Sequence, residues 1–402
     1  MQKKFYYSLI GLFLALSSLC NAQTWINSST GIGKLSTNSI IKVNDYLFAG
    51  TWNGGVFIST DNGDNWSASN MGLTNLKVYC LLEKDSRLFA ATWNGGVFLS
   101  TDMGSNWTEV NSGLTSKATS YLASNTNSIF VGTYPGGVFS TTDYGMNWVA
   151  INQGLSCLDI SYVAVINQKI FATTHSGGVF ISSDGGSNWQ ISNEGLPYKS
   201  ISGIAGNETN IFIGNFDEKG TEKGGVFYSE NGGTSWIDIN SNITRIHIHS
   251  IVSDGNYVFA GAYGKVFFTK DKGANWLDIS NGLPNNPVLR MLVIDNYLYA
   301  CIQNNGVYKL NISEVSVNDK NTNNDLIISP NPASDYITIT LKPSEGFEPS
   351  EGSVIQIFNT LGETVMSTDA RHAVPLQINI SDLPKGMYFV KVGDKTAKFV
   401  KM

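Results

Sequence analysis

Hydrophobic and β-branched residues in most of this chain occur in runs of four or five, separated by short polar turns. One stretch shows the arrangement clearly, with runs at residues 162–166, 170–174, 179–182 and 188–191. Gly, Asn and Asp bound these runs, as they do in tight β-turns. The pattern predicts four short antiparallel strands in a row.

A short motif marks the turn before the fourth strand of each unit. It reads Ser or Thr, any residue, Asp, any residue, Gly, any two residues, Trp, and its first copy is residues 59–66. The tryptophans of six copies are 41, 41, 41, 47 and 40 residues apart, and one copy has Asn231 in place of Asp. We expect these residues to have a structural role in each unit: Asp61, Trp66, Asp102, Trp107, Asp143, Trp148, Asp184, Trp189, Trp236, Asp271 and Trp276.

Four strands in about 40 residues is the size of one blade of a β-propeller. Trp25 lies 41 residues before Trp66, and Gly31 follows it by six, as a glycine follows five of the six motif tryptophans. Residues 289–310 supply three strands without a tryptophan. We therefore predict seven blades over residues 23–312, the last completed by the N-terminal strand, so that no sheet edge is exposed there.

The repeat resembles the Asp-box, or BNR-repeat, propellers, which include sialidases, family 74 xyloglucanases, sortilin-type receptors and photosystem assembly propellers. The resemblance implies that each Asp carboxylate accepts hydrogen bonds within its own turn and that each Trp packs between blades. It does not fix the function, because one fold carries many functions. Asp61 to Asp64 superficially resemble a calcium loop but lack its distant glutamate, so no metal site is predicted.

Equivalent loops of a propeller form a ring around one axis, and the residue after each second strand is the candidate ligand site. Aromatic faces and amide groups at such a ring suit the CH faces of sugars or an extended peptide. The alternative is that the same side chains only pack one blade against the next. The ring consists of Trp52, Trp93, Tyr134, His175, Phe216, Tyr263 and Gln303.

Catalytic candidates are few. The propeller arginines, Arg87, Arg245 and Arg290, follow their preceding tryptophans by 21, 9 and 14 residues, so they are not expected to converge as in a sialidase. Glycoside hydrolysis requires two carboxyl groups on either side of the scissile bond, and nothing in the spacing indicates such a pair. The weak candidates on the ring's face are Asp159, Asp217, Glu218 and Glu222.

Other cofactor chemistry is not indicated. His247 and His249 alternate, but metal binding would need a third ligand that the sequence does not identify. The net charge of −6, without basic runs, argues against nucleic-acid binding. We expect a non-catalytic binding propeller for glycan or peptide, with a glycoside hydrolase as the alternative and a passive surface component as a third reading.

The N-terminus has the features of a secretory signal peptide. Lys3 and Lys4 precede a short apolar run at residues 9–19, and Ala22 ends a stretch of small residues. The run is too short for a membrane span, so cleavage after residue 22 is predicted to leave a mature chain without one. Three cysteines at unrelated positions would remain, and we expect them to be unpaired and buried: Cys80, Cys157 and Cys301.

The composition changes after residue 312. Residues 313–325 are rich in Asn, Asp and Ser and are predicted to form a linker, and residues 326–402 a small strand-rich sandwich. The motifs at residues 330–332, 359–362, 383–388 and 398–401 resemble the type A C-terminal sorting domain of the type IX secretion system. The resemblance implies export across an outer membrane, cleavage by a surface sortase, and release or surface attachment. The alternative is an adhesive module that the mature protein keeps.

Overall fold

The computed structural model describes residues 24–206, 210–216, 224–243, 246–255, 257–312, 326–329, 333–341, 354–359, 363–369, 376–392 and 395–401. The predicted signal peptide, the predicted linker and the candidates Asp217, Glu218 and Glu222 lie outside these residues. The regular secondary structure of the described part is entirely β-strand. The chain divides into two compact units, Met1–Val315 and Ser316–Met402.

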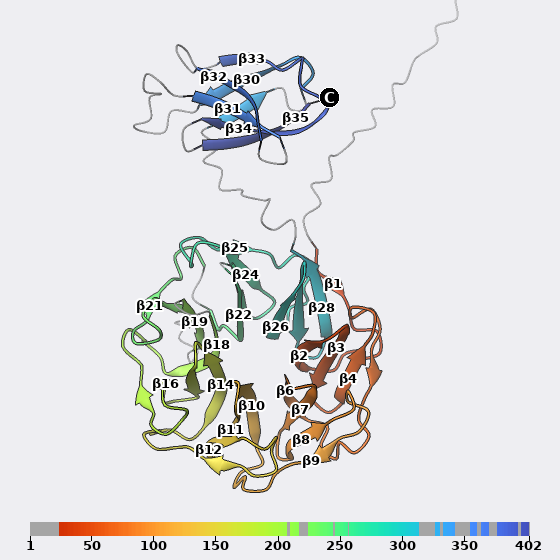
Figure 1. Ribbon diagram of the computed structural model, residues 1–402, viewed down its shortest axis with the longest axis vertical. Helices are drawn as coiled ribbons and strands as arrows, with labels where there is room; N and C mark the ends of the chain where they lie inside the picture. The colour runs from red at the N-terminus through yellow and green to blue at the C-terminus, as the bar shows by residue number, and fades with distance from the viewer. Residues whose placement is uncertain are drawn as a thin grey trace, which may run out of the picture. The chain divides into compact units, whose positions relative to one another are not determined.

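The first unit is a seven-bladed β-propeller, as predicted, with seven four-stranded antiparallel sheets among its described residues (Figure 1). Neighbouring inner strands contact one another in a closed ring, which β2 completes by contacting β26. The inner strands are β2 (Thr37–Val43), β6 (Val78–Lys84), β10 (Thr119–Ser124), β14 (Ile160–Ile166), β18 (Ser200–Gly206), β22 (Ser250–Asp254) and β26 (Val288–Ile294).

The remaining strands of each blade follow outward from the axis. The second strands are β3 (Tyr46–Thr51), β7 (Arg87–Thr92), β11 (Ile129–Thr133), β15 (Lys169–Thr174), β19 (Ile211–Phe216), β23 (Tyr257–Gly261) and β27 (Tyr297–Ile302). The third strands are β4 (Gly55–Ser59), β8 (Gly96–Ser100), β12 (Gly137–Thr141), β16 (Val179–Ser182), β20 (Gly225–Ser229), β24 (Val266–Thr269) and β28 (Gly306–Asn311). The outer strands are β5 (Ser67–Ala68), β9 (Thr108–Glu109), β13 (Val149–Ala150), β17 (Gln190–Ile191), β21 (Ile237–Asp238), β25 (Leu277–Asp278) and β1 (Ile26–Asn27).

One blade combines the two ends of the propeller sequence. Strand β1 pairs antiparallel with β28, with Ile26 opposite Lys309. The indole of Trp25 is 3% exposed and donates a hydrogen bond of 2.7 Å to the carbonyl of Ile279 in the preceding blade. The chain ends are thus joined by backbone pairing and by a buried side chain.

The motif tryptophans join each blade to the one before it. The six side chains of the motif copies are 3–5% exposed. Trp107 packs with Phe48 and Val56 of the preceding blade, and its indole donates to the carbonyl of Ser69 at 2.8 Å. Each tryptophan therefore buries a large apolar surface between blades and satisfies its polar N–H there.

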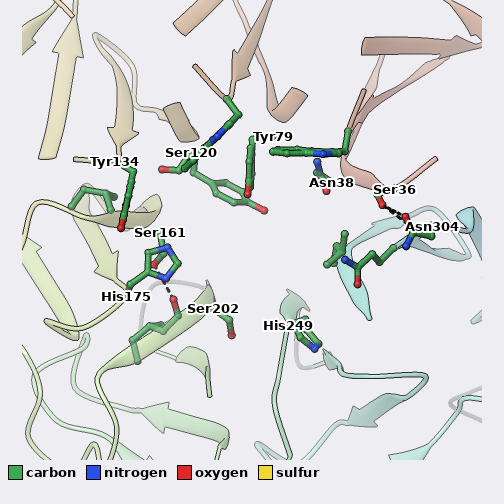
Figure 2. A pocket seen from close by; sticks show the side chains of 17 residues that line it. Ser36, Asn38, Tyr79, Ser120, Tyr134, Ser161, His175, Ser202, His249 and Asn304 are labelled. Atoms are coloured by element: carbon green, nitrogen blue, oxygen red, sulfur yellow. Dashed lines mark hydrogen bonds between the residues drawn. The ribbon is translucent and has the colours of Figure 1, made fainter. Parts of the chain in front are cut away.

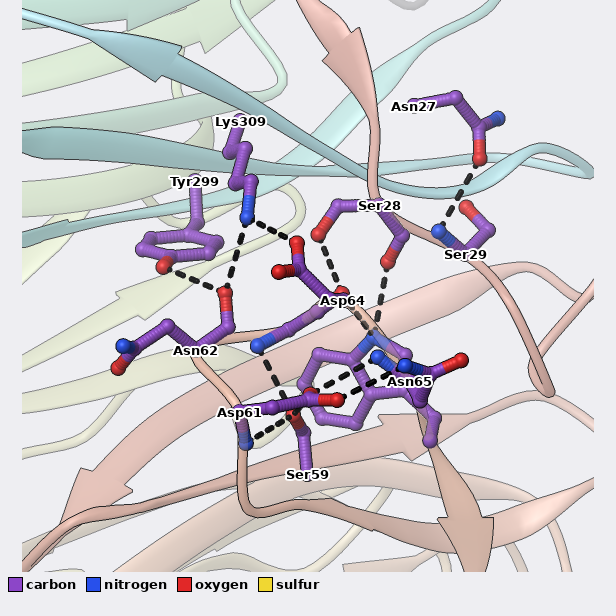
Figure 3. Close-up of polar contacts among 12 residues, drawn as sticks. Asn27, Ser28, Ser29, Ser59, Asp61, Asn62, Asp64, Asn65, Tyr299 and Lys309 are labelled. Carbon is purple, nitrogen blue, oxygen red and sulfur yellow. Dashed lines mark hydrogen bonds and ion pairs between the residues drawn. The ribbon is translucent and has the colours of Figure 1, made fainter.

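The Asp-box turn is a closed set of local hydrogen bonds (Figure 3). The Asp61 carboxylate accepts from the Ser59 hydroxyl at 2.8 Å and from the backbone and side-chain N–H groups of Asn65 at 2.9 and 2.8 Å. Ser59 Oγ in turn accepts from the backbone N–H of Gly63 at 2.8 Å. The hydrogen bonds from Asn65 and Ser59 lower the pKa of Asp61 to about 2.

The second unit is an Ig-like β-sandwich of two sheets. One sheet has the order β29 (Leu326–Ser329), β30 (Tyr336–Leu341), β33 (Leu376–Asn379). The other has the order β32 (Thr364–Asp369), β31 (Val354–Phe358), β34 (Gly386–Val392), β35 (Lys395–Lys401). Ile337, Ile357, Val390 and Phe399 are at most 1% exposed and form the core between the sheets. Within the described ranges no helix is long and apolar enough to span a membrane.

Candidate ligand-binding site

A cavity of about 620 Å³ lies at the propeller axis, on the face of the loops between second and third strands (Figure 2). Two sets of residues line it, one from these loops and one from the inner strands. Five residues of the predicted ring belong to the first set: Trp52, Trp93, Tyr134, His175 and Gln303. Tyr263, at the equivalent position of another blade, is 55% exposed and does not line the cavity. Phe216 ends β19, and its side chain lies outside the described part.

Backbone hydrogen bonds hold the ring residues beside the inner strands. The N–H of Trp52 donates to the carbonyl of Ser36 at 2.8 Å, and that of Tyr134 to Ala118 at 2.8 Å. The N–H of Trp93 makes the corresponding bond to Lys77 at 2.9 Å. Each loop is thereby fixed to the connection that enters the inner strand, so the side chains have a defined position at the rim.

The inner strands supply a second set of lining residues that the sequence analysis missed. In six of the seven blades the pairing of the inner strand with its neighbour shifts by one residue, a β-bulge, close to the lining position. A bulge turns an extra side chain away from the regular alternation of the strand. The first five residues of the set are 41 residues apart, a signal that could have found them: Asn38, Tyr79, Ser120, Ser161 and Ser202, followed by His249 and Leu289.

Five rings from the two sets form a continuous series that we call the aromatic arc. Its order is Trp52, Tyr79, Trp93, Tyr134 and His175, and the successive ring centroids are 5.4, 5.7, 6.0 and 6.0 Å apart. The Lys77 ammonium lies 5.2 Å from the centroid of the Trp52 ring. Tyr134 is 41% exposed, so part of the arc is accessible from solvent.

Hydroxyl and amide groups occupy the rest of the cavity wall (Figure 2). Ser36 donates to the side-chain carbonyl of Asn304 at 2.8 Å, and the amide of Asn38 donates to the carbonyl of Val78 at 3.0 Å. The hydroxyl of Ser161 donates to the carbonyl of Ile201 at 2.8 Å. The hydroxyl of Ser120 is buried and has no hydrogen-bond partner. The wall therefore offers both donors and acceptors next to the arc.

The cavity wall carries little charge near neutral pH. Burial, and then the proximity of His247, lower the pKa of His249 to about 4, so this imidazole is neutral. The described lining contains no Asp, Glu, Lys or Arg side chain. Such a wall favours ligands recognised through ring faces and hydrogen bonds.

The catalytic candidates and the arginines do not meet in this cavity. Asp159 accepts a backbone hydrogen bond from His175 but does not belong to the lining. Arg87 lies at the surface with its guanidinium 4.1 Å from the Tyr144 ring centroid. Arg290 lies in a second cavity, described below, and Arg245 lies outside the described residues.

Family models match three parts of the chain. A BNR/Asp-box repeat model matches residues 57–68, and a secretion system C-terminal sorting domain model matches residues 327–402. The molecule is thus an Asp-box β-propeller with a type IX sorting domain. The type IX system handles such chains, which are secreted and attached at the cell surface or outer membrane. A third model, the DUF6242 beta propeller domain, matches residues 99–323, more than half of the chain, and the chain belongs to this family.

Solved structures share the fold at low sequence identity. YCF48 from Cyanidioschyzon merolae is 14% identical, with a TM-score of 0.58 over 71% of this chain and 98% of that chain. YCF48 bound to D1 peptide is 13% identical, with a TM-score of 0.59 over 73% and 97%. The GH74 xyloglucanase from Xanthomonas campestris is 12% identical, with a TM-score of 0.58 over 79% and 59%. No curated protein matches the sequence.

Proposed function

We propose that this protein is a binding propeller of the cell exterior, which holds a glycan or an extended peptide in the axial cavity without chemically changing it. The aromatic arc along the wall of a cavity of about 620 Å³ carries the proposal. Aromatic faces give a ligand a large contact area, and nearby hydroxyl and amide groups orient it.

The exposure of the arc supports ligand binding over a purely structural role. Tyr79 packs between Trp52 and Trp93, as the structural alternative requires. Tyr134, however, is 41% exposed at the cavity wall, and large exposed aromatic groups in a concave site favour a ligand. Two structural neighbours are YCF48 bound to D1 peptide and a GH74 xyloglucanase, which is consistent with either ligand class for a cavity on this fold.

Hydrolysis receives less support. A glycosidase places two carboxyl groups on either side of the scissile bond. Asp159, the described candidate, is not among the lining residues. Binding is therefore the function that the geometry of the described residues supports best.

Glycan and peptide arrays, probed with the chain from residue 23 onward, test the proposal. We expect binding without release of product, and we expect Tyr134→Ala to weaken it about tenfold, because one stacking surface is lost. Tyr263→Ala is the matched control, since it removes an aromatic ring from the equivalent position outside the cavity. Unchanged binding by the Tyr134 variant would contradict the proposal, and released product would establish the hydrolase instead.

We also propose that residues 313–325 link the two units and that a surface sortase cleaves there. The contact pattern divides the chain at Val315 and Ser316, inside this segment. Mass spectrometry of the surface-exposed protein is expected to find a new C-terminus within these residues. An intact C-terminus at Met402 would support the retained adhesive module.

A further inference from the structure

Arg290 occupies an unusual position on the propeller axis. It extends from β26 to two tyrosines on the opposite inner strands, β10 and β14. Its guanidinium carbon lies 5.2 Å from the ring centroid of Tyr121 and 5.1 Å from that of Tyr162, and the two rings stack at 3.7 Å. We call these three residues the axial cluster.

The axial cluster separates two cavities. Tyr121 lines the cavity that carries the aromatic arc and also a second cavity of about 300 Å³. Arg290 and Tyr162 line the second cavity together with apolar residues of the inner strands. A ligand that enters along the arc therefore meets Tyr121, whose ring centroid lies 5.2 Å from the Arg290 guanidinium carbon in the adjoining cavity.

The charge of Arg290 has no counter-ion among the described residues. No carboxylate there pairs with it, and its neighbours are the tyrosine rings and the thiols of Cys80 and Cys301. Burial raises the pKa of both thiols and raises that of Tyr121 to about 12, so all three groups are neutral at physiological pH. Because its carbon lies 5.2 and 5.1 Å from two ring centroids that are themselves 3.7 Å apart, the guanidinium sits beside the edges of the stacked rings, and its N–H donors pair with no carboxylate of the described residues.

An unpaired cation in a partly desolvated channel favours a bound anion, because desolvation without a counter-charge is costly. A second group beside the cluster also lacks a partner. The hydroxyl of Ser120 is in a residue that is 7% exposed, directly before Tyr121, and makes no hydrogen bond. An anionic group placed beside Tyr121 would give Arg290 the counter-ion that it lacks among the described residues.

We propose that the axial cluster binds the carboxylate of an acidic sugar, a hexuronate, whose ring and neighbouring rings lie on the aromatic arc. The planar guanidinium fork matches a carboxylate. The wall favours a sugar over a peptide, because Ser, Asn and Gln groups lie beside the aromatic arc, and the aliphatic lining is limited to Ile160, Ile201 and Leu289. This inference rests on the proposed binding function and specifies its ligand.

Calorimetric titration of the wild-type chain with tetragalacturonic acid and with its methyl ester tests the proposal without a variant. The two probes have the same sugar chain and differ at the carboxyl groups, which are charged in the acid and neutral methyl esters in the other. We expect the acid to bind at least about tenfold more tightly, and the difference to shrink as the NaCl concentration rises. Equal binding of acid and ester would overturn this inference while leaving the binding function intact. Binding of neither probe, of no other oligosaccharide and of no peptide would overturn both.

Variants of Arg290 then test whether this residue causes the preference for the acid over the ester. We expect Arg290→Gln to bind acid and ester equally, and Arg290→Lys to keep part of the preference because it keeps the charge. Arg87→Gln is the control, since it removes another arginine that lies beside a tyrosine ring, away from the axis. Binding of the ester by the Gln variant shows that its cavity is intact. A preference that survives Arg290→Gln, or tighter binding of acidic peptides than of the acid, would refute the proposal.

Discussion

At the scale of single residues, the Asp-box turns show how one side chain depends on another four positions away. Five boxes pair an Asp with an Asn directly before the Trp, and the Asn amide donates to the carboxylate, as Asn106 does to Asp102 at 2.8 Å. The sixth box changes both positions. Asn231 replaces the Asp, and its amide donates to the hydroxyl of Ser235 at 2.9 Å. The Asp–Asn pair and the Asn–Ser pair are thus two alternative hydrogen-bonded pairs at the same positions of the turn.

This reciprocity predicts the outcome of a pair of substitutions. Asp102→Asn alone places two amide donors against each other and is expected to lower the melting temperature. Adding Asn106→Ser provides an acceptor, as Ser235 does, and is expected to restore most of the loss. Differential scanning calorimetry of the two variants measures the effect. A double variant that melts no higher than the single one would show that the pairing is not what stabilises the turn.

At the scale of the elements, a glycine sets the distance between neighbouring blades. Gly113 follows Trp107 by six residues and has a φ of +86°, and a Cβ atom there would lie 2.2 Å from the carbonyl oxygen of Trp148 in the next blade. The six-residue spacing from Trp to Gly is visible in the sequence, but only the structure gives the reason for it. The offset marks a position where the backbones of neighbouring blades approach closely.

We therefore expect Gly113→Ala to lower the free energy of unfolding by about 3 kcal/mol, from left-handed strain together with the backbone clash. Gly185→Ala is the matched control. Gly185 also has a positive φ, +72°, but a Cβ there would meet nothing within 4 Å, so the expected cost is about 1 kcal/mol. Chemical denaturation measures both values. Equal costs would mean that the backbone clash between blades adds nothing to the cost of the Gly113 substitution.

At the scale of the whole molecule, the repeated Asp boxes make the stability of the folded chain depend on pH in the acidic range. Hydrogen bonds within the turn lower the pKa of all five box aspartates, to about 2 for Asp61 and Asp184. The unfolded chain, with pKa values near 3.8, takes up protons at a higher pH than the folded chain. The stabilisation is therefore complete above about pH 4 and is lost as the pH falls toward 2.

The expected result is a melting temperature that is nearly constant from pH 7 to 5 and falls steeply between about pH 4 and 2. The chain with Asp102→Asn and Asn106→Ser has one titrating box fewer and should lose less. Calorimetry across this pH series at constant ionic strength checks both statements. A flat profile below pH 4 would contradict the lowered pKa values.

The cavity is where prediction from sequence was incomplete. The ring after the second strands was found because it recurs once per repeat, and five of its seven members line the cavity. Tyr263 has the same place in its repeat but does not. The inner-strand set was missed, since a bulge reverses the alternation from which facing side chains are inferred. Whether these residues bind a ligand stays a prediction.

The sequence by itself determined the seven-bladed propeller, the Ig-like sandwich and the secreted or surface location, and each of these predictions is confirmed. It could do so because strand lengths, turn hydrogen bonds and the period of the tryptophans are local properties that every repeat encodes again. Only the tertiary structure decided which side chains meet at the axis. Tyr79 reaches Trp52 through a bulge, and Arg290 reaches Tyr121 across the channel from a strand more than 100 residues away. Such contacts form only when the ring of blades is closed, so they cannot be predicted from the spacing of residues within a single repeat.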